Sequence, residues 1–155
     1  MTVRVGIIGS GFARAAYLPA LRHVPEARVV AIASARLERA RAAAEAFGVP
    51  HATDDWRALL RDHELDLVCI ATPTDLHAPM TLAALDAGSH VLCEKPTAMD
   101  AAEAKAMREK AAGAGVEADL PAPPWRRAHQ PGHQHVVEPV VVVVAPRDQG
   151  VRGIR

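Results

Sequence analysis

The chain begins with a short apolar segment that runs directly into two closely spaced glycines. Residues 3–8, VRVGII, are followed at once by Gly9, Ser10 and Gly11, and the residues after them are compatible with a helix. This pattern predicts a buried strand, a tight turn and a helix in immediate succession. That order of elements is typical of Rossmann-type domains, in which the turn holds a dinucleotide.

The glycine turn has the chemistry of a pyrophosphate site. Gly9 allows the tight turn, and Gly11 has no Cβ, so the backbone there can approach a phosphate group. The unpaired N–H groups at the helix start then face its charge. We therefore predict that residues 9–13 bind the cofactor, namely Gly9, Ser10, Gly11, Phe12 and Ala13. A plain strand-to-helix turn without a ligand is the alternative.

The third position of the glycine fingerprint departs from the rule. Arg14 stands where a small residue normally allows close packing of helix and strand. We expect Ala13 to take over that role through a slight rotation of the helix. Pro19 is expected to break or kink this first helix, because proline cannot donate a backbone hydrogen bond.

Strands and helices then alternate, and this predicts an α/β fold with a parallel sheet and helices on both faces. Thr53 or Asp54 is expected to cap one helix, and Asp100 with Glu103 another. Gly48 and Pro50 are expected to end a helix, and so is Gly88. The predicted strands are Val29–Ala33, Leu67–Ala71 and His90–Cys93, and the predicted helices are Leu37–Phe47, Trp56–Arg61, Thr81–Ala87 and Ala101–Ala112.

Composition excludes several classes of protein. The 18 basic and 18 acidic residues cancel, so no nucleic-acid partner is predicted. No apolar run is long enough for a membrane span, and the N-terminus has no signal-peptide layout. Cys69 and Cys93 lack a C-x-x-C spacing, and we expect both to be buried packing residues of a cytoplasmic protein.

The pattern changes near Val116, so we predict a nucleotide-binding domain at residues 1–116 and an irregular, proline-rich tail at 117–155. One interpretation is a tail that carries one additional strand at Val140–Val144. The other, which we favour, is a change of reading frame, because 15 arginines against three lysines indicate GC-rich coding DNA. This apolar run is also a candidate for sheet-edge pairing or self-association. His129, His133 and His135 are spaced too irregularly to predict a metal site.

The end of the second predicted strand indicates which dinucleotide is bound. NAD-specific sites usually place an acidic residue here, but no acid occurs before Glu38. Ser34 and Arg36 instead offer a hydroxyl and a guanidinium, which suit the 2′-phosphate of NADP. NADP is therefore the predicted cofactor, with NAD as the second option. The alternative for Arg36 is a solvated side chain at a helix start.

Two further segments follow predicted strands, at the edge where parallel sheets bind ligands. The first is Ala71-Thr72-Pro73 with His77 beyond it, and the second is Glu94-Lys95-Pro96. Lys95 can reach the cleft there, while Pro96 fixes the turn, with a cis bond as one option.

Four segments together resemble the N-terminal half of the Gfo/Idh/MocA oxidoreductases, the glucose-fructose oxidoreductase and inositol dehydrogenase family. The resemblance covers residues 3–116 and is carried by GIIGSGFARAAYLPAL, AIASARLERA, CIATPTDLHAPM and VLCEKPTAMD. It implies a catalytic Lys95 near the nicotinamide. It also implies that Thr72, Pro73 and His77 line the cofactor groove and that Glu94 fixes the ribose side.

The resemblance implies hydride transfer between a nicotinamide and a sugar or polyol. The family's substrate domain has no counterpart in residues 117–155, so the chain alone is expected to be inactive. A partner chain that carries the missing domain is one expectation. The alternative function is a non-catalytic module that binds or senses a nucleotide.

Overall fold

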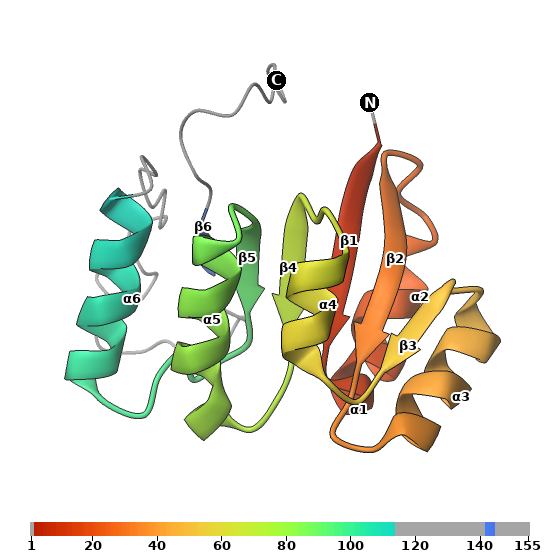
Figure 1. Cartoon of the computed structure of the whole chain (residues 1–155), viewed down its shortest axis with the longest axis horizontal. Helices are drawn as coiled ribbons and strands as arrows, with labels where there is room; N and C mark the ends of the chain where they lie inside the picture. Colours follow the sequence, from red (N-terminus) through yellow and green to blue (C-terminus); the bar gives the residue numbers. More distant parts are fainter. Residues whose placement is uncertain (1, 114–141, 145–155) are drawn as a thin grey trace, which may run out of the picture.

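The computed structural model describes residues 2–113 and 142–144, which form a six-stranded sheet in the order β3-β2-β1-β4-β5-β6 (Figure 1). The first five strands pair in parallel, and β6 pairs antiparallel with β5. This confirms the predicted α/β fold of the Rossmann type. The strands are β1 (Val3–Ile8), β2 (Ala27–Ala33), β3 (His51–Thr53), β4 (Leu67–Ile70), β5 (His90–Cys93) and β6 (Val142–Val144).

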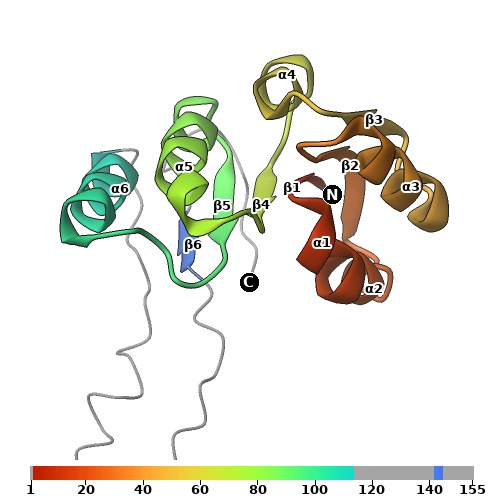
Figure 2. The same cartoon turned by 90° about the horizontal axis from the view of Figure 1, so that it is seen from below.

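Helices cover both faces of the sheet, as predicted (Figure 2). The first three helices pack on one face of the sheet, and the last three helices lie on the other face. The helices are α1 (Ser10–Phe12), α2 (Leu18–Leu21), α3 (Leu37–Phe47), α4 (Trp56–Asp62), α5 (His77–Asp86) and α6 (Ala101–Gly113), with a π-helical segment at Ala13–Tyr17 and a 3₁₀ turn at Thr74–Leu76.

The central strands β1 and β4 are buried on both faces over most of their length, which is why they read as largely apolar runs. Ile7 and Cys69 belong to the core under α2 and α3, whereas Ile8 and Cys93 belong to the core under α4 and α5. The prediction that both cysteines are buried packing residues is confirmed, since each side chain is at most 2% exposed. Burial raises the pKa of the Cys69 thiol to about 12 and that of Cys93 to about 11.

The first helix continues through Pro19, so the expected break does not occur. Its hydrogen bonding instead changes to the π pattern over Ala13–Tyr17, and Leu18 N–H donates to the carbonyl of Ala13. Pro19 then occupies the first turn of α2. A proline is tolerated there because the first N–H groups of a helix need no partner within it.

Two local predictions were wrong, and one strand was not predicted. Asp55 caps α4, because its carboxylate accepts from Arg57 N at 2.8 Å, and neither Thr53 nor Asp54 does so. Helix α5 begins at His77 rather than Thr81, since Pro79 lies in its first turn, where no N–H donor is required. Strand β3 is too short for its pattern to be recognised, and pairing with β2 defines it.

Other helix ends agree with the sequence. Gly48 ends α3 in the left-handed conformation, with φ of 69°. Asp100 accepts from the N–H groups of Ala102 and Glu103 at the start of α6, and the Glu103 carboxylate accepts from Met99 N–H. This reciprocal arrangement is the predicted cap.

The predicted boundary near Val116 and most of the predicted tail lie outside the described residues. The exception is β6, which lies within the apolar run Val140–Val144 and pairs with the edge of the sheet, as one prediction proposed. Among the described residues, no helix is both long and apolar enough to cross a membrane.

Candidate functional site

A cavity of about 540 Å³ opens at the carboxyl ends of β1, β2 and β4. In Figure 1 these ends are the arrowheads near α1. Parallel sheets bind their ligands at this edge. The cavity is lined by Ile8, Gly9, Ser10, Gly11, Ala33, Ser34, Ala35, Arg39, Asp54, Trp56, Ala71, Thr72, Pro73, Leu76 and Met80.

The two glycines of the turn are required for different reasons. Gly9 has a φ of 107°, and a Cβ there would overlap the carbonyl of Ala71, so only glycine fits. Its N–H donates to the carbonyl of Ala33 at 2.8 Å, which holds β1 against β2. A Cβ on Gly11, in contrast, would meet no atom within 4 Å. Gly9 is therefore needed by the fold, whereas Gly11 keeps the cavity wall open.

Ala13 replaces the missing small residue of the fingerprint, as expected. Its side chain is fully buried against the sheet, and Arg14 is exposed. Neither Ala13 nor Phe12 lies on the cavity wall. Phe12 is 48% exposed and packs edge-to-face against Tyr17, with ring centroids 5.4 Å apart. The turn thus contributes Gly9, Ser10 and Gly11 to the wall.

The end of β2 brings two serines together. Ser10 Oγ lies 2.8 Å from Ser34 Oγ, and Ser34 N–H donates to the carbonyl of Thr53 at 3.1 Å. Arg36, which the sequence favoured, precedes α3 with an exposed side chain that does not line the cavity. Arg39, in the first turn of α3, is on the wall instead.

Sequence reasoning missed Arg39, Asp54 and Trp56. Arg39 carried a recognisable signal, because it lies three residues after Arg36, where a helix can direct both side chains to one side. Asp54 and Trp56 reach the wall only because β3 pairs beside β2. That pairing was not predicted from the sequence.

The predicted site residues after β4 fall into two groups, according to whether they line the cavity. Ala71, Thr72 and Pro73 lie on the cavity wall. His77 is 1% exposed and does not line the cavity, so the expectation that it lines the groove is not met. Its ring nitrogens lie 2.8 Å from the carbonyl oxygen of Thr72 and 2.9 Å from that of Pro96. The imidazole therefore connects the loop after β4 to the loop after β5.

The loop after β5 carries Glu94, Lys95 and Pro96, beyond the cavity wall. Glu94 N–H donates to the carbonyl of Ile70, which fixes the start of this loop against β4. The Lys95 side chain is exposed, and its bond to Pro96 is cis, one of the options predicted.

Tyr17 is a further residue that sequence reasoning missed. Its hydroxyl donates to Glu94 Oε1 at 2.5 Å, while Lys95 N–H donates to Glu94 Oε2 at 3.3 Å. Burial raises the pKa of Tyr17 above its usual range, and the Glu94 carboxylate raises it further. The carboxylate thus links the first helix to the backbone of Lys95.

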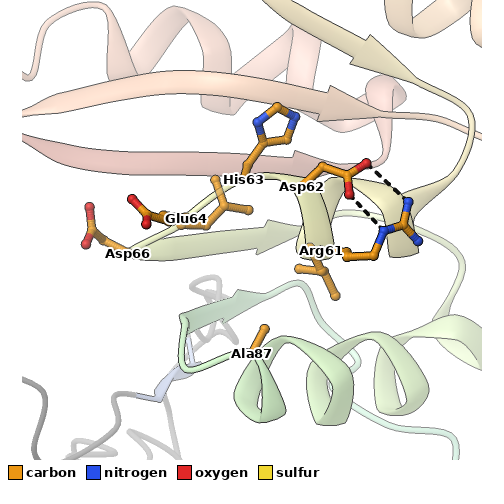
Figure 3. Close-up of a pocket in the computed structure, with 8 residues that line it drawn as sticks. Arg61, Asp62, His63, Glu64, Asp66 and Ala87 are labelled. Carbon is orange, nitrogen blue, oxygen red and sulfur yellow. Dashed lines mark hydrogen bonds and ion pairs between the residues drawn. The ribbon is translucent and has the colours of Figure 1, made fainter.

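A second cavity of about 420 Å³ lies on the side of the sheet where the parallel strands begin, between the end of α4 and the start of β4 (Figure 3). Its charged groups are engaged with neighbours. Arg61 pairs with Asp62 at 2.8 Å, Arg4 with Glu64 at 2.7 Å, and Asp66 accepts from Arg4 N–H. Exposed pairs of this kind are ordinary surface features, so the first cavity remains the candidate site.

Residues 3–119 match the model of the GFO_IDH_MocA oxidoreductase family, described as an NAD-binding Rossmann fold. The levoglucosan dehydrogenase of Pseudarthrobacter phenanthrenivorans is 41% identical over 114 residues, which are 68% of this chain and 29% of that protein. The D-xylose 1-dehydrogenase (NADP(+)) 2 of Haloferax volcanii is 42% identical over 112 residues, or 72% of this chain and 34% of that protein.

Solved structures agree. A 3-ketoreductase from Actinomadura kijaniata, in complex with TDP-benzene and NADP, matches with a TM-score of 0.68 and 38% identity, over 73% of this chain and 36% of that one. A biliverdin reductase from Synechocystis, in complex with biliverdin and NADP⁺, matches with a TM-score of 0.67 and 36% identity, over 73% and 35%. The chain thus spans about a third of the length of these relatives.

Proposed function

The chain belongs to the Gfo/Idh/MocA oxidoreductase family and carries its NAD(P)-binding Rossmann domain, and we propose that it binds NADP(H) in preference to NAD(H). The cavity at the carboxyl ends of β1, β2 and β4 is the proposed site. The observation that carries this proposal is the turn at Gly9–Gly11, which leaves open space over Gly11 beside the start of the first helix. A pyrophosphate fits there, because backbone N–H groups at a helix start favour an anion.

The preference for NADP rests on the end of β2. Ser34 and Arg39 give that wall a hydroxyl and a guanidinium, which can bind a 2′-phosphate through charge-assisted hydrogen bonds. No acidic residue follows β2 directly, where an NAD-specific site usually has one. Asp54 adds a carboxylate to the same wall, so the preference requires that Arg39 and Ser34 outweigh this like charge. The solved relatives from Actinomadura and Synechocystis hold NADP and NADP⁺, respectively.

The loops after β4 and β5 form the proposed nicotinamide end. A bound nicotinamide would supply hydride transfer at its C4 atom. Thr72 and Pro73 are proposed to contact the cofactor, with His77 holding their loop from behind. Lys95 is the proposed catalytic residue, because its exposed ammonium can hydrogen-bond to a substrate hydroxyl. Glu94 is proposed to fix the ribose side and the backbone of Lys95.

We propose a sugar or polyol as the substrate. The relatives include a levoglucosan dehydrogenase and a D-xylose 1-dehydrogenase. The residues that would hold such a substrate against the nicotinamide are proposed to lie outside residues 1–155, for example on a partner chain. Without them, Lys95 alone cannot position the reacting carbon, so residues 1–155 by themselves should show no turnover.

Two measurements on the purified chain test this function. Calorimetric titration should detect saturable NADPH binding, and Gly11→Val should abolish it by filling the open space of the turn. Incubation with NADP⁺ and a panel of sugars and polyols should give no increase in NADPH absorbance. Failure to bind either dinucleotide would refute the cofactor assignment, and measurable oxidation would refute the need for further residues.

A further inference from the structure

We propose that Ser10 is a positioning residue for cofactor choice, acting through Ser34. In this arrangement Ser10 donates its hydroxyl proton to Ser34 Oγ, and Ser34 then donates its own proton to a 2′-phosphate on the adenosine ribose. The inference rests on the proposed function, because it concerns the same cavity. It adds a residue of the glycine turn to the group that distinguishes NADP from NAD.

The two serines lie just beyond the ends of β1 and β2, where hydrogen bonds fix the backbone. Ser10 Oγ and Ser34 Oγ are 2.8 Å apart, and both residues line the cavity. Ser10 is 6% exposed, so water has little access to replace Ser34 as its partner. Gly9 N–H donates to Ala33 O at 2.8 Å, and Ser34 N–H donates to Thr53 O. The backbone on each side of the pair is therefore fixed, and this keeps the two hydroxyls within hydrogen-bond distance.

The number of hydroxyl protons decides which serine donates the hydrogen bond when a phosphate is bound. Each hydroxyl has one proton to donate and two lone pairs to accept with. The contact between the serines uses one of the two protons and leaves the other available to a ligand. A phosphate dianion only accepts, so Ser34 can serve it as a donor only when Ser10 is the donor within the pair. A chain of hydrogen bonds aligned in this way is strengthened by polarisation.

A ribose 2′-hydroxyl does not require Ser34 to be the donor. It can donate as well as accept, so either direction of the serine pair satisfies NAD(H). Arg39 on the same wall adds positive charge, which favours the phosphate over the hydroxyl. Without the Ser10 hydroxyl, Ser34 keeps its proton but loses the hydrogen bond that positions and polarises it, so NADP(H) binding should weaken selectively. The effect should require Ser34, because Ser10 acts only through it.

The test is a double-mutant cycle on the whole chain, with dissociation constants for NADPH and NADH. We expect Ser34→Ala to weaken NADPH binding by about tenfold and Ser10→Ala by about fivefold, since hydrogen bonds to charged groups are the stronger ones. The double variant should bind NADPH no more weakly than Ser34→Ala. NADH binding should change by less than about twofold in each case. Ser10→Thr, which keeps a hydroxyl, should restore most of the NADPH affinity.

Thermal unfolding and circular dichroism of each variant separate this role from a folding defect. Independent effects that add in the double variant would overturn the inference, and so would equal losses for NADPH and NADH in Ser10→Ala. Both results would leave cofactor binding by the unaltered chain intact, so the proposed function would stand. An unaltered chain that binds neither dinucleotide would overturn the proposed function and this inference together.

Discussion

The hydroxyl of Tyr17 lies 2.5 Å from Oε1 of Glu94, although the two residues are 77 positions apart in the sequence. Tyr17 ends the π-helical segment that follows the glycine turn, and Glu94 begins the loop after β5. Because Glu94 Oε2 also accepts from Lys95 N–H, one carboxylate connects the two ends of the proposed cofactor site. This contact thus fixes the position of the loop after β5 relative to the helix that follows the glycine turn.

This contact predicts the alkaline titration of the protein. Tyr17 is the single tyrosine, so the phenolate absorbance reports it alone. Burial and the Glu94 carboxylate raise its pKa in the folded state, so their stabilising effect is complete below the unfolded pKa near 10 and is lost as the pH rises above it. We expect phenolate absorbance to appear only as circular dichroism reports unfolding.

Two controls define this titration. In concentrated guanidinium chloride, Tyr17 should titrate near the ordinary tyrosine pKa. Without denaturant, Glu94→Gln should lower the pH at which phenolate appears, because it removes a negative charge beside the hydroxyl. A native Tyr17 that ionises near pH 10 with the fold intact would contradict the contact.

The two glycines of the turn should separate folding from binding. Gly9→Ala is expected to lower the free energy of unfolding by about 2 kcal/mol or more, because φ is positive there and the Cβ overlaps the Ala71 carbonyl. Gly11→Val should leave the unfolding temperature nearly unchanged and abolish NADPH binding. Thermal denaturation and calorimetry measure the two effects. A stable Gly9→Ala protein, or a Gly11→Val protein with full affinity, would show that the roles are assigned wrongly.

Arg39 and Arg36 provide a matched pair for the phosphate site. Both side chains are exposed, but Arg39 lines the cavity and Arg36 does not. Arg39→Ala should weaken NADPH binding by roughly tenfold, in line with a charge-assisted hydrogen bond. Arg36→Ala should change it by less than about twofold, because Arg36 does not line the cavity. The reverse order would restore the expectation drawn from the sequence alone.

The two thiols should react slowly in the native state. Burial raises the pKa of Cys69 to about 12 and that of Cys93 to about 11, so little thiolate exists at mildly alkaline pH. An aromatic disulfide reagent should therefore label neither residue rapidly until guanidinium chloride is added, after which both react. Rapid labelling of the folded protein would show that one thiol is accessible.

The sequence predicted the fold well because its strongest signals are local. The glycine turn, the apolar strands and the caps at Asp100 and Gly48 each follow from neighbouring residues, and the structure confirms them. Strand β3 and the entry of Asp54 and Trp56 into the cavity depend on pairing between segments distant along the chain. No local pattern contains that information.

The site was predicted in part for the same reason. Gly9, Ser10 and Thr72 reach the cavity because they directly follow strand ends, which the apolar pattern locates. His77 was recognised as part of the site, but its place behind the wall depends on a contact with the Pro96 carbonyl. The Tyr17–Glu94 contact likewise required the three-dimensional arrangement of two distant loops.

The relative affinity of the chain for NADPH and NADH tests the central claim most directly. Both dissociation constants should be measured on the same preparation at the same ionic strength, because phosphate contacts weaken with salt. We expect NADPH to bind roughly tenfold to a hundredfold more tightly, as one or two charge-assisted contacts to the 2′-phosphate would give. Equal affinities, or tighter binding of NADH, would contradict the assignment of the wall formed by Ser34 and Arg39.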